Sequence, residues 1–424
     1  MPTARALGTA TDQPCADCHG AAPEAGHGRL AVPRRAAFWL LAFVFGATML
    51  GTTLPTPLYV IYQSQWHFSQ AITTVIFATY AAAVLAALLL AGRSSDQAGR
   101  KPVLAVALVT SALSTIVFIL APDVAALLAG RILSGLSAGL MTGTATAALT
   151  ELVPASARRR ASLVATAVNM GGLGLGPLIA GLFARYGPRP TVLVFEVYLA
   201  LLAVTGLCVL VLPETVPPRG RPALRFAGLG IPEQGRSEFA AAGVAGFAAF
   251  SVLGLYSALA PTFLGTVLHQ HSHVVEGAVV FLIFSAGTVA QVLLFRLPSR
   301  PVVLAGLGVF LAALALIVTA LSVASMAVFL TGTVIGGAAV GAVFLGSLAT
   351  ANRLAPPERR GQTVSTYFVL CYGGLIIPPI GVGVASVFIG DFASVLAFSI
   401  LLAALSLFSL TRITRSLTPA SATR

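Results

Sequence analysis

The sequence predicts an all-α integral membrane protein with twelve transmembrane helices arranged in two six-helix halves. Three observations support this fold class: the composition, a regular series of apolar segments, and an internal repeat. Apolar residues make up 57% of the 424 residues and charged residues 9%, whereas soluble proteins carry about 25% charged residues. The mean hydropathy is +0.93. A chain of this composition is expected to lie in a lipid bilayer.

Twelve apolar segments are long enough to cross a bilayer at a helical rise of ~1.5 Å per residue. Short links rich in arginine, glycine and proline separate these segments. The predicted spans are approximately 36–62, 70–92, 102–121, 124–150, 161–184, 190–212, 238–266, 276–295, 301–321, 325–349, 363–388 and 392–411.

The basic residues indicate the orientation of these spans. The chain holds 25 Lys and Arg residues against 13 Asp and Glu, and no basic patch with interleaved aromatic residues occurs, which argues against a nucleic-acid partner. If the N-terminus is cytoplasmic, all basic residues except Arg131, Arg185 and Arg189 fall in the tails and inner links. The positive-inside rule therefore predicts a multi-pass protein of the cell inner (plasma) membrane with both termini cytoplasmic.

An internal repeat divides the chain into two related halves. Arg158 and the glycine-rich segment 171–181 realign with Arg360 and the segment 373–383 at an offset of 202 residues. Helical transporters are commonly built from such repeats, with a binding site between the halves near the midplane. The predicted parts are an N-terminal tail (1–35), a first six-helix bundle (36–212), a linker (213–237), a second six-helix bundle (238–411) and a C-terminal tail (412–424).

The charged link between the second and third spans carries the pattern Gly92-x-x-x-Asp96-x-x-Gly99-Arg100-Lys101. It resembles the corresponding loop of major facilitator superfamily transporters, and span number, linker and repeat extend the resemblance over residues 36–411. The resemblance implies the fold of that family and a latch that holds the cytoplasmic side closed. Asp96 is expected to pair with Arg100 and to lie at a helix N-terminus, and Gly99 to supply a turn. The alternative is a plain basic turn. The second half lacks the acid, so any second latch is expected to be weaker.

Two glycine patterns add to this resemblance. Gly172, Gly176, Pro177 and Gly181 in the fifth span resemble the signature of the exporters of the superfamily, although Ala180 stands where the family usually has a glycine. Glycines four residues apart also occur in membrane helices simply because they let helices pack closely. Import therefore remains the alternative to export. In the fourth span, Arg131 followed by Gly135 and Gly139 resembles a signature whose arginine is linked to proton coupling.

Polar residues within the spans are the candidates for coupling and for the cavity. A charge in the hydrocarbon core costs about 2.5–3.5 kcal/mol on insertion scales. Arg131 either holds an acid ionised, binds an anionic or carbonyl group, or is a structural arginine bound by backbone carbonyls. Glu196 near the outer end of span six is a second candidate, and a protonated packing glutamate is the alternative. The uncharged candidates, for which interhelical hydrogen bonding of ~0.6 kcal/mol is the alternative role, are Thr142, Thr146, Asn169, Tyr256, Gln291, Tyr367 and Tyr372.

Two Cys/His patterns are weighed and set aside. Cys15-Ala16-Asp17-Cys18-His19 matches the attachment pattern of c-type haem, but the segment is predicted to be a cytoplasmic tail without a signal core. A weak zinc or redox site with His27 is a further alternative. His269, His271 and His273 alternate in an outer link, but three histidines alone make a poor metal site. No nucleotide-binding loop or hydrolase constellation occurs.

These observations predict a secondary transporter that is not an enzyme and needs no cofactor or metal. We expect it to act as a monomer by alternating access and to export a small, largely apolar compound against proton entry. One alternative is an uptake permease. The alternative from another class is a non-transporting membrane protein whose N-terminal Cys/His segment binds haem or a metal.

Overall fold

The computed structural model describes residues 32–91, 94–218, 228–356 and 359–415, and this part of the chain is helical with short connections. Twelve of its helices are long and apolar enough to cross a membrane. The first six are α1 (Arg34–Thr53), α3 (Gln70–Ala91), α5 (Arg100–Leu120), α6 (Val124–Glu151), α7 (Arg158–Tyr186) and α8 (Leu193–Val211). The second six are α9 (Arg236–Thr266), α10 (His273–Leu294), α11 (Ser299–Ser322), α12 (Met326–Leu354), α13 (Arg360–Ile389) and α14 (Asp391–Arg415).

Three short helices lie in the connections: α2 (Tyr59–Trp66), α4 (Ser94–Ala98) and the 3₁₀ turn η1 (Ala155–Ala157). The predicted span over 36–62 is divided in the structure, because α1 ends at Thr53 and α2 continues it after a break. Pro55 and Pro57 lie in the break, and a proline inside a helix removes a hydrogen bond and clashes with the preceding turn. Helix α14 also runs to Arg415, so the predicted C-terminal tail begins as helix.

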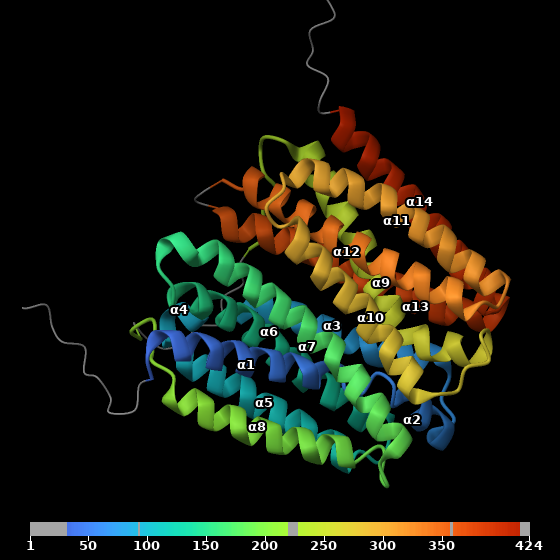
Figure 1. Cartoon of the computed structure of the whole chain (residues 1–424), viewed down its shortest axis with the longest axis horizontal. Coiled ribbons are helices and arrows are strands. Elements are labelled where there is room, and N and C mark those ends of the chain that lie inside the picture. Colours follow the sequence, from blue (N-terminus) through green and yellow to red (C-terminus); the bar gives the residue numbers. More distant parts are fainter. Residues whose placement is uncertain (1–31, 92–93, 219–227, 357–358, 416–424) are drawn as a thin grey trace, which may run out of the picture.

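The twelve spans form two bundles that lie side by side (Figure 1). Helices α1 to α8 build the N-terminal half, and α9 to α14 build the C-terminal half. Two helix pairs make the main contacts between the halves: α7 with α10, and α3 with α13. We call the side that carries the start of α1, the connection between α8 and α9, and the end of α14 the linker face. The other side is called the opposite face.

The sequence repeat is a repeat of contacts in space. A Cβ atom on Gly135 of α6 would lie 2.4 Å from the carbonyl oxygen of Tyr80 on α3. At the same offset of 202 residues, a Cβ atom on Gly337 of α12 would lie 2.4 Å from the carbonyl oxygen of Ile283 on α10. The two halves therefore bring equivalent helices together at equivalent glycines, where a side chain would block the approach.

Helix α7 uses its glycines against two different partners. On one face Gly172 and Gly176 meet α1 within the N-terminal half, where added Cβ atoms would lie 2.5 Å and 2.3 Å from backbone oxygens. Toward the opposite face, Gly181 meets α10 of the other half, and the carbonyl oxygen of Pro177 lies against Gly277. The glycine-rich segment thus packs α7 into its own bundle and also joins the two bundles.

Candidate functional site: a cavity between the two halves

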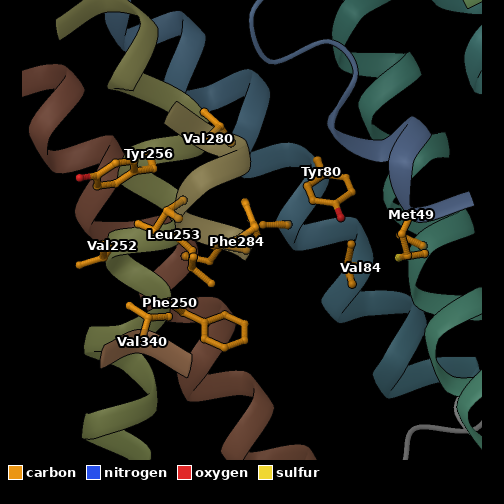
Figure 2. Packing of buried hydrophobic residues seen from close by; sticks show 14 of the residues in the cluster. Met49, Tyr80, Val84, Phe250, Val252, Leu253, Tyr256, Val280, Phe284 and Val340 are labelled. Carbon is orange, nitrogen blue, oxygen red and sulfur yellow. The ribbon is translucent and has the colours of Figure 1, made fainter. Parts of the chain in front are cut away.

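A cavity of about 370 Å³ lies between the two bundles. Helices α1, α3, α6 and α7 wall it on one side, and α9, α10, α12 and α13 wall it on the other. Within the described part of the chain no charged side chain lines it. Figure 2 shows Phe250, Leu253 and Phe284 of the C-terminal half lying across from Tyr80 and Val84 of the N-terminal half. The aromatic lining residues are Phe77, Tyr80, Phe250, Phe284, Phe344, Phe368 and Tyr372.

The cavity extends from the middle of the bundle toward the linker face. Leu88, Thr146 and Ser162 belong to its wall, and each lies within two turns of the linker-face end of its helix. No lining residue comes from the last three turns of α7 or α13 at the opposite face. The cavity therefore reaches closer to the linker face than to the opposite face.

Close contacts between helices of the two halves seal the opposite face. A Cβ atom on Gly181 would lie 2.3 Å from the carbonyl oxygen of His273, so α7 and α10 touch there. A Cβ atom on Gly383 of α13 would lie 2.6 Å from the side chain of Thr74 on α3. Both contacts join the N-terminal half to the C-terminal half, and they have to separate if the cavity is to open at this face.

Four of the polar residues proposed from the sequence line this cavity: Thr142, Thr146, Asn169 and Tyr372. Thr142 and Thr146 are one turn apart on α6, so their hydroxyls share one face of that helix. The side-chain oxygen of Asn169 is buried and has no hydrogen-bond partner in the described part of the chain. An unpaired amide oxygen beside an otherwise apolar cavity is a candidate contact for a donor group on a ligand.

The other three uncharged candidates do not line the main cavity. The Tyr256 hydroxyl lies 2.9 Å from Thr333 Oγ1 on α12, and Figure 2 shows the ring pointing away from the N-terminal residues. Tyr367 is bound to Ser347 of α12 at 2.8 Å. Gln291 is buried beside a much smaller adjoining pocket between α9, α10 and α12. Tyr256 and Tyr367 turn toward α12, so their hydroxyls find partners inside the C-terminal half.

Glu196 lies outside the cavity as well. It occupies the first turn of α8 at the opposite face. Its carboxylate lies 3.2 Å from the Arg189 guanidinium, and both side chains are partly exposed. The residue is therefore a peripheral ion-pair partner rather than part of the cavity wall.

Arg131 on α6 is fully buried, with 0% exposure. Its Nε donates a hydrogen bond to the Tyr59 hydroxyl, and its Nη1 donates to the Thr52 carbonyl oxygen at 2.5 Å. Its Nη2 has no hydrogen-bond partner in the described part of the chain. The guanidinium carbon lies 5.1 Å from the centre of the Tyr59 ring and 5.4 Å from that of Tyr80.

Two contacts of Arg131, those with the Tyr80 ring and with the Thr52 carbonyl, lead to the cavity wall. Tyr80 lines the cavity, as does Thr53, the neighbour of the residue whose carbonyl Arg131 binds. The guanidinium therefore lies one side chain behind the cavity wall. No ion pair between Arg131 and a carboxylate occurs among residues 32–91, 94–218, 228–356 and 359–415. The hypothesis that Arg131 holds a nearby acid ionised therefore lacks a candidate acid among these residues.

The charged link between α3 and α5 forms an ionic cluster at the linker face. Arg100 Nη1 lies 2.7 Å from Asp96 and its Nη2 lies 2.7 Å from Glu151 at the end of α6. Glu214 accepts hydrogen bonds from the backbone amides of Arg100 at 2.7 Å and Lys101 at 3.0 Å. Gly92 lies outside the described residues.

Gly99 makes this cluster possible. Its φ of +92° is a conformation that side chains disfavour, and a Cβ atom would lie 2.7 Å from Glu214 Oε2. The hydrogen-bond and ion-pair partners of Asp96, Arg100 and Lys101 in the described residues belong to the N-terminal half or to the start of the linker. In this conformation the predicted latch therefore ties α4, α5, α6 and the start of the linker together, and its described contacts do not cross to the C-terminal half.

Sequence reasoning missed Glu276. Among the Asp and Glu residues in the described part of the chain, Glu276 alone is buried, with 2% exposure. Its Oε2 lies 3.0 Å from Nδ1 of His273. The next residue, Gly277, packs against Pro177 of α7, which places the pair at the seal between the halves. The available signal was an acid three residues after a histidine at the start of an apolar segment.

The Cys/His alternatives gain no support from the structure. Cys15, Cys18, His19 and His27 lie outside the described residues. Within the residues that are described, no group of three or more His, Cys, Asp or Glu side chains is arranged to hold a metal ion. In the link with His269, His271 and His273, His273 pairs with Glu276.

Two six-helix bundles around a shared apolar cavity define a membrane transporter fold. The family model of the Major Facilitator Superfamily matches residues 41–379. The chain belongs to this superfamily, and it is a multi-pass membrane protein. No curated protein matches the sequence significantly.

Several solved structures share the fold. The crystal structure of the human organic anion transporter MFSD10 (TETRAN) has 21% identity and a TM-score of 0.64, covering 89% of this chain and 100% of that one. A bacterial homologue of the human lysosomal transporter Spinster, in an inward-facing and unoccupied conformation, has 17% identity and a TM-score of 0.69 over 91% of this chain and 99% of that one. Its inward-facing, occupied form has 16% identity and a TM-score of 0.70 over 92% and 100%. At these identities the likeness concerns the fold alone.

Proposed function

We propose that the chain is a proton-coupled exporter of a small, largely apolar compound, that it works as a monomer in the plasma membrane, and that it is not an enzyme. The observation that carries this proposal is the cavity at the boundary of the two halves. It is aromatic, uncharged at its wall, accessible toward one face and sealed at the other. A cavity of this kind changes its accessible side when the two halves tilt against each other.

The orientation follows from the distribution of arginines. The clustered basic residues belong to the helix ends and connections of the linker face, and basic loops face the cytoplasm. On this proposal the linker face is cytoplasmic and the conformation described above is inward-facing. The Spinster homologue in the comparison was also solved in inward-facing conformations, which supports this assignment.

The cavity wall supports an apolar substrate with an aromatic or branched body. Its volume of about 370 Å³ lies within the range of about 300–1,000 Å³ for small-molecule sites. Apart from the aromatic rings, the wall offers hydroxyls and one amide, among them Thr142, Thr146 and Asn169. These groups position a ligand by hydrogen bonds and leave most of its affinity to apolar burial.

Glu276 is the proposed proton-binding group. Export against protons requires a group whose protonation differs between the two conformations. In the inward-facing conformation Glu276 is buried and pairs with the partly exposed His273 at the sealed face. Tilting the halves apart would separate α10 from α7 there and expose the pair to water. Burying an ionised carboxylate is unfavourable unless it is paired, so proton uptake by this pair favours the sealed, inward-facing conformation.

Two alternatives are retained. An uptake permease would use the same cavity in the other direction, and the contacts of the glycines in α7 are explained by packing without reference to direction. A non-transporting role for the Cys15–His19 segment remains a separate hypothesis. Deletion of residues 1–31 tests it: unchanged transport removes this alternative.

The proposal is tested by expressing the protein in a drug-sensitive bacterium that lacks its own pumps. A panel of apolar compounds is screened for resistance, and accumulation is then measured with and without a protonophore. We expect resistance to a subset of aromatic compounds and its collapse when the proton gradient is removed. Increased accumulation of the same compounds would favour the uptake permease, and export that survives the protonophore would contradict proton coupling.

A further inference from the structure

We infer that the transported compound carries a negative charge on its apolar body, and that Arg131 is the group that selects this charge. This inference rests on the proposed function and specifies its substrate class. Its starting point is a fully buried guanidinium whose Nη2 has no hydrogen-bond partner in the described part of the chain. A buried ion without a compensating charge is strongly unfavourable. A binding partner that supplies the missing negative charge would remove this penalty.

The repeat shows that packing does not require the charge. Thr333 lies at the position equivalent to Arg131, because both precede their first packing glycine, Gly337 or Gly135, by four residues. Thr333 is also fully buried, and it is satisfied by a neutral hydrogen bond with Tyr256. The C-terminal half therefore achieves the same helix contact with two uncharged side chains. The positive charge of Arg131, at the equivalent place in the N-terminal half, is therefore not explained by helix packing.

The cavity lies close enough to Arg131 for the guanidinium charge to act on a ligand bound there. Tyr80 lines the cavity and lies with its ring centre 5.4 Å from the Arg131 guanidinium carbon. The Thr52 carbonyl that Arg131 binds is adjacent in the chain to Thr53 of the cavity wall.

Within the described residues, no negatively charged side chain at the cavity wall offsets the positive potential of Arg131. No Asp or Glu lines the wall in the described residues, and the low polarity of the surroundings screens the guanidinium only weakly. Glu151 pairs with Arg100 and Glu276 pairs with His273, each away from the cavity wall. An anion on an aromatic body is therefore stabilised in the cavity, and a cation of the same shape is disfavoured.

The test uses three probes with one aromatic body: naphthylacetate, naphthylacetamide and naphthylethylammonium. Their binding to the purified full-length protein is measured by titration calorimetry at neutral pH. We expect naphthylacetate to bind about tenfold more tightly than the amide, which corresponds to about 1.4 kcal/mol, and the ammonium compound to bind most weakly. The variant Arg131→Gln should lose the preference for the anion, and Arg131→Lys should keep it. Arg189→Gln, which removes an exposed arginine, is the control that should change nothing.

Equal or tighter binding of the amide or the ammonium compound to the wild type would overturn the inference, as would an anion preference that survives in Arg131→Gln. If Arg131→Gln does not fold, the ranking of the three probes on the wild type still decides. Proton-dependent transport of the neutral amide without transport of the anion would leave the proposed function intact and refute this inference. Absence of binding by all three probes would also refute it, while the compound panel judges the proposed function separately.

Discussion

The two halves of the molecule share their packing but differ in their charges. Gly135 on α6 and Gly337 on α12 make equivalent backbone contacts with the same approach distance. Four residues earlier, however, the N-terminal half has the cation Arg131 and the C-terminal half has the neutral Thr333. The repeat therefore distinguishes the contacts that both halves make from the features that only one half carries. Close helix packing is common to both halves, and the buried cation belongs to one.

The linker face shows the same difference. In the N-terminal half, Arg100 binds Asp96 and Glu151, and Glu214 binds the backbone beside it. In the C-terminal half, Arg300 donates to the backbone carbonyl of Ile413. A separate ion pair joins Arg353 and Glu238 at 2.5 Å between α12 and α9. The N-terminal half thus holds a linked cluster of acids around one arginine, and we expect it to contribute more to conformational control.

The largest expected difference between the halves concerns Arg131 and Thr333. Arg131→Leu should lower the rate of proton-linked transport by about tenfold or more, since it removes the charge and leaves the Tyr59 hydroxyl and the Thr52 carbonyl without their donor, at about 1–3 kcal/mol for each buried unpaired group. Thr333→Val should leave the transport rate nearly unchanged, because it removes one neutral hydrogen bond that contributes only about 1 kcal/mol of stability. Transport into everted vesicles, normalised to the amount of protein in the membrane, measures both. Equal losses in the two variants would contradict the distinction between the halves.

The next effect concerns Glu276. Glu276→Gln should reduce the acceleration of transport by an imposed pH gradient by about fivefold or more, within the usual range of coupling energies, because the amide cannot take up a proton. Glu196→Gln, which removes a partly exposed partner of Arg189, is the matched control. The measurement is the initial rate of transport with and without the gradient. A normal response to the gradient in Glu276→Gln would show that another group carries the proton.

A smaller effect is expected at the ionic cluster. Asp96→Asn and Glu151→Gln should slow transport by about threefold while leaving the protein in the membrane, because single ion pairs at accessible positions contribute little on their own. Glu238→Gln in the C-terminal half is the comparison and should slow transport less. Rates are compared at equal expression. Full activity of Asp96→Asn and Glu151→Gln would count against a role of this cluster in gating.

The smallest difference between the halves is expected at the packing glycines. Gly135→Val and Gly337→Val should each lower stability by about 1–3 kcal/mol, because the added side chains overpack equivalent contacts. Gly143→Ala is the control, since a Cβ atom there would meet nothing within 4 Å. Thermal unfolding of the purified variants in detergent measures these effects. A large effect in one half alone would show that the contacts are not equivalent.

Composition and periodicity were sufficient to predict the twelve spans and the repeat, because long apolar helices leave a clear signal in a sequence. They did not predict which side of each helix faces the cavity. Tyr256 and Tyr367 were expected at the wall, but the helix crossing turns both toward α12. The rotation of a helix about its own axis depends on its contacts with neighbouring helices, and the sequence of that one helix does not determine it.

Glu276 was missed for a related reason. The predicted span began at residue 276, whereas α10 begins at His273, so an expected boundary residue lies one turn inside the helix. Its burial also depends on α7, which packs against this turn through Pro177. A contact between segments about a hundred residues apart leaves no local pattern in the sequence. Arg131, in contrast, was recognisable because a charge within an apolar span is conspicuous by itself.

The most direct test of the account is a pair of distance measurements between spin labels on the two halves. One pair is placed at the linker face at Ser156 and Arg360, and the other at the opposite face at Tyr186 and Phe388, in a variant whose four cysteines are replaced. Changing the pH or adding a transported compound should shift the two distances in opposite directions, so that the linker face closes as the opposite face opens. Distances that stay constant, or that increase together, would contradict two halves tilting around a shared cavity.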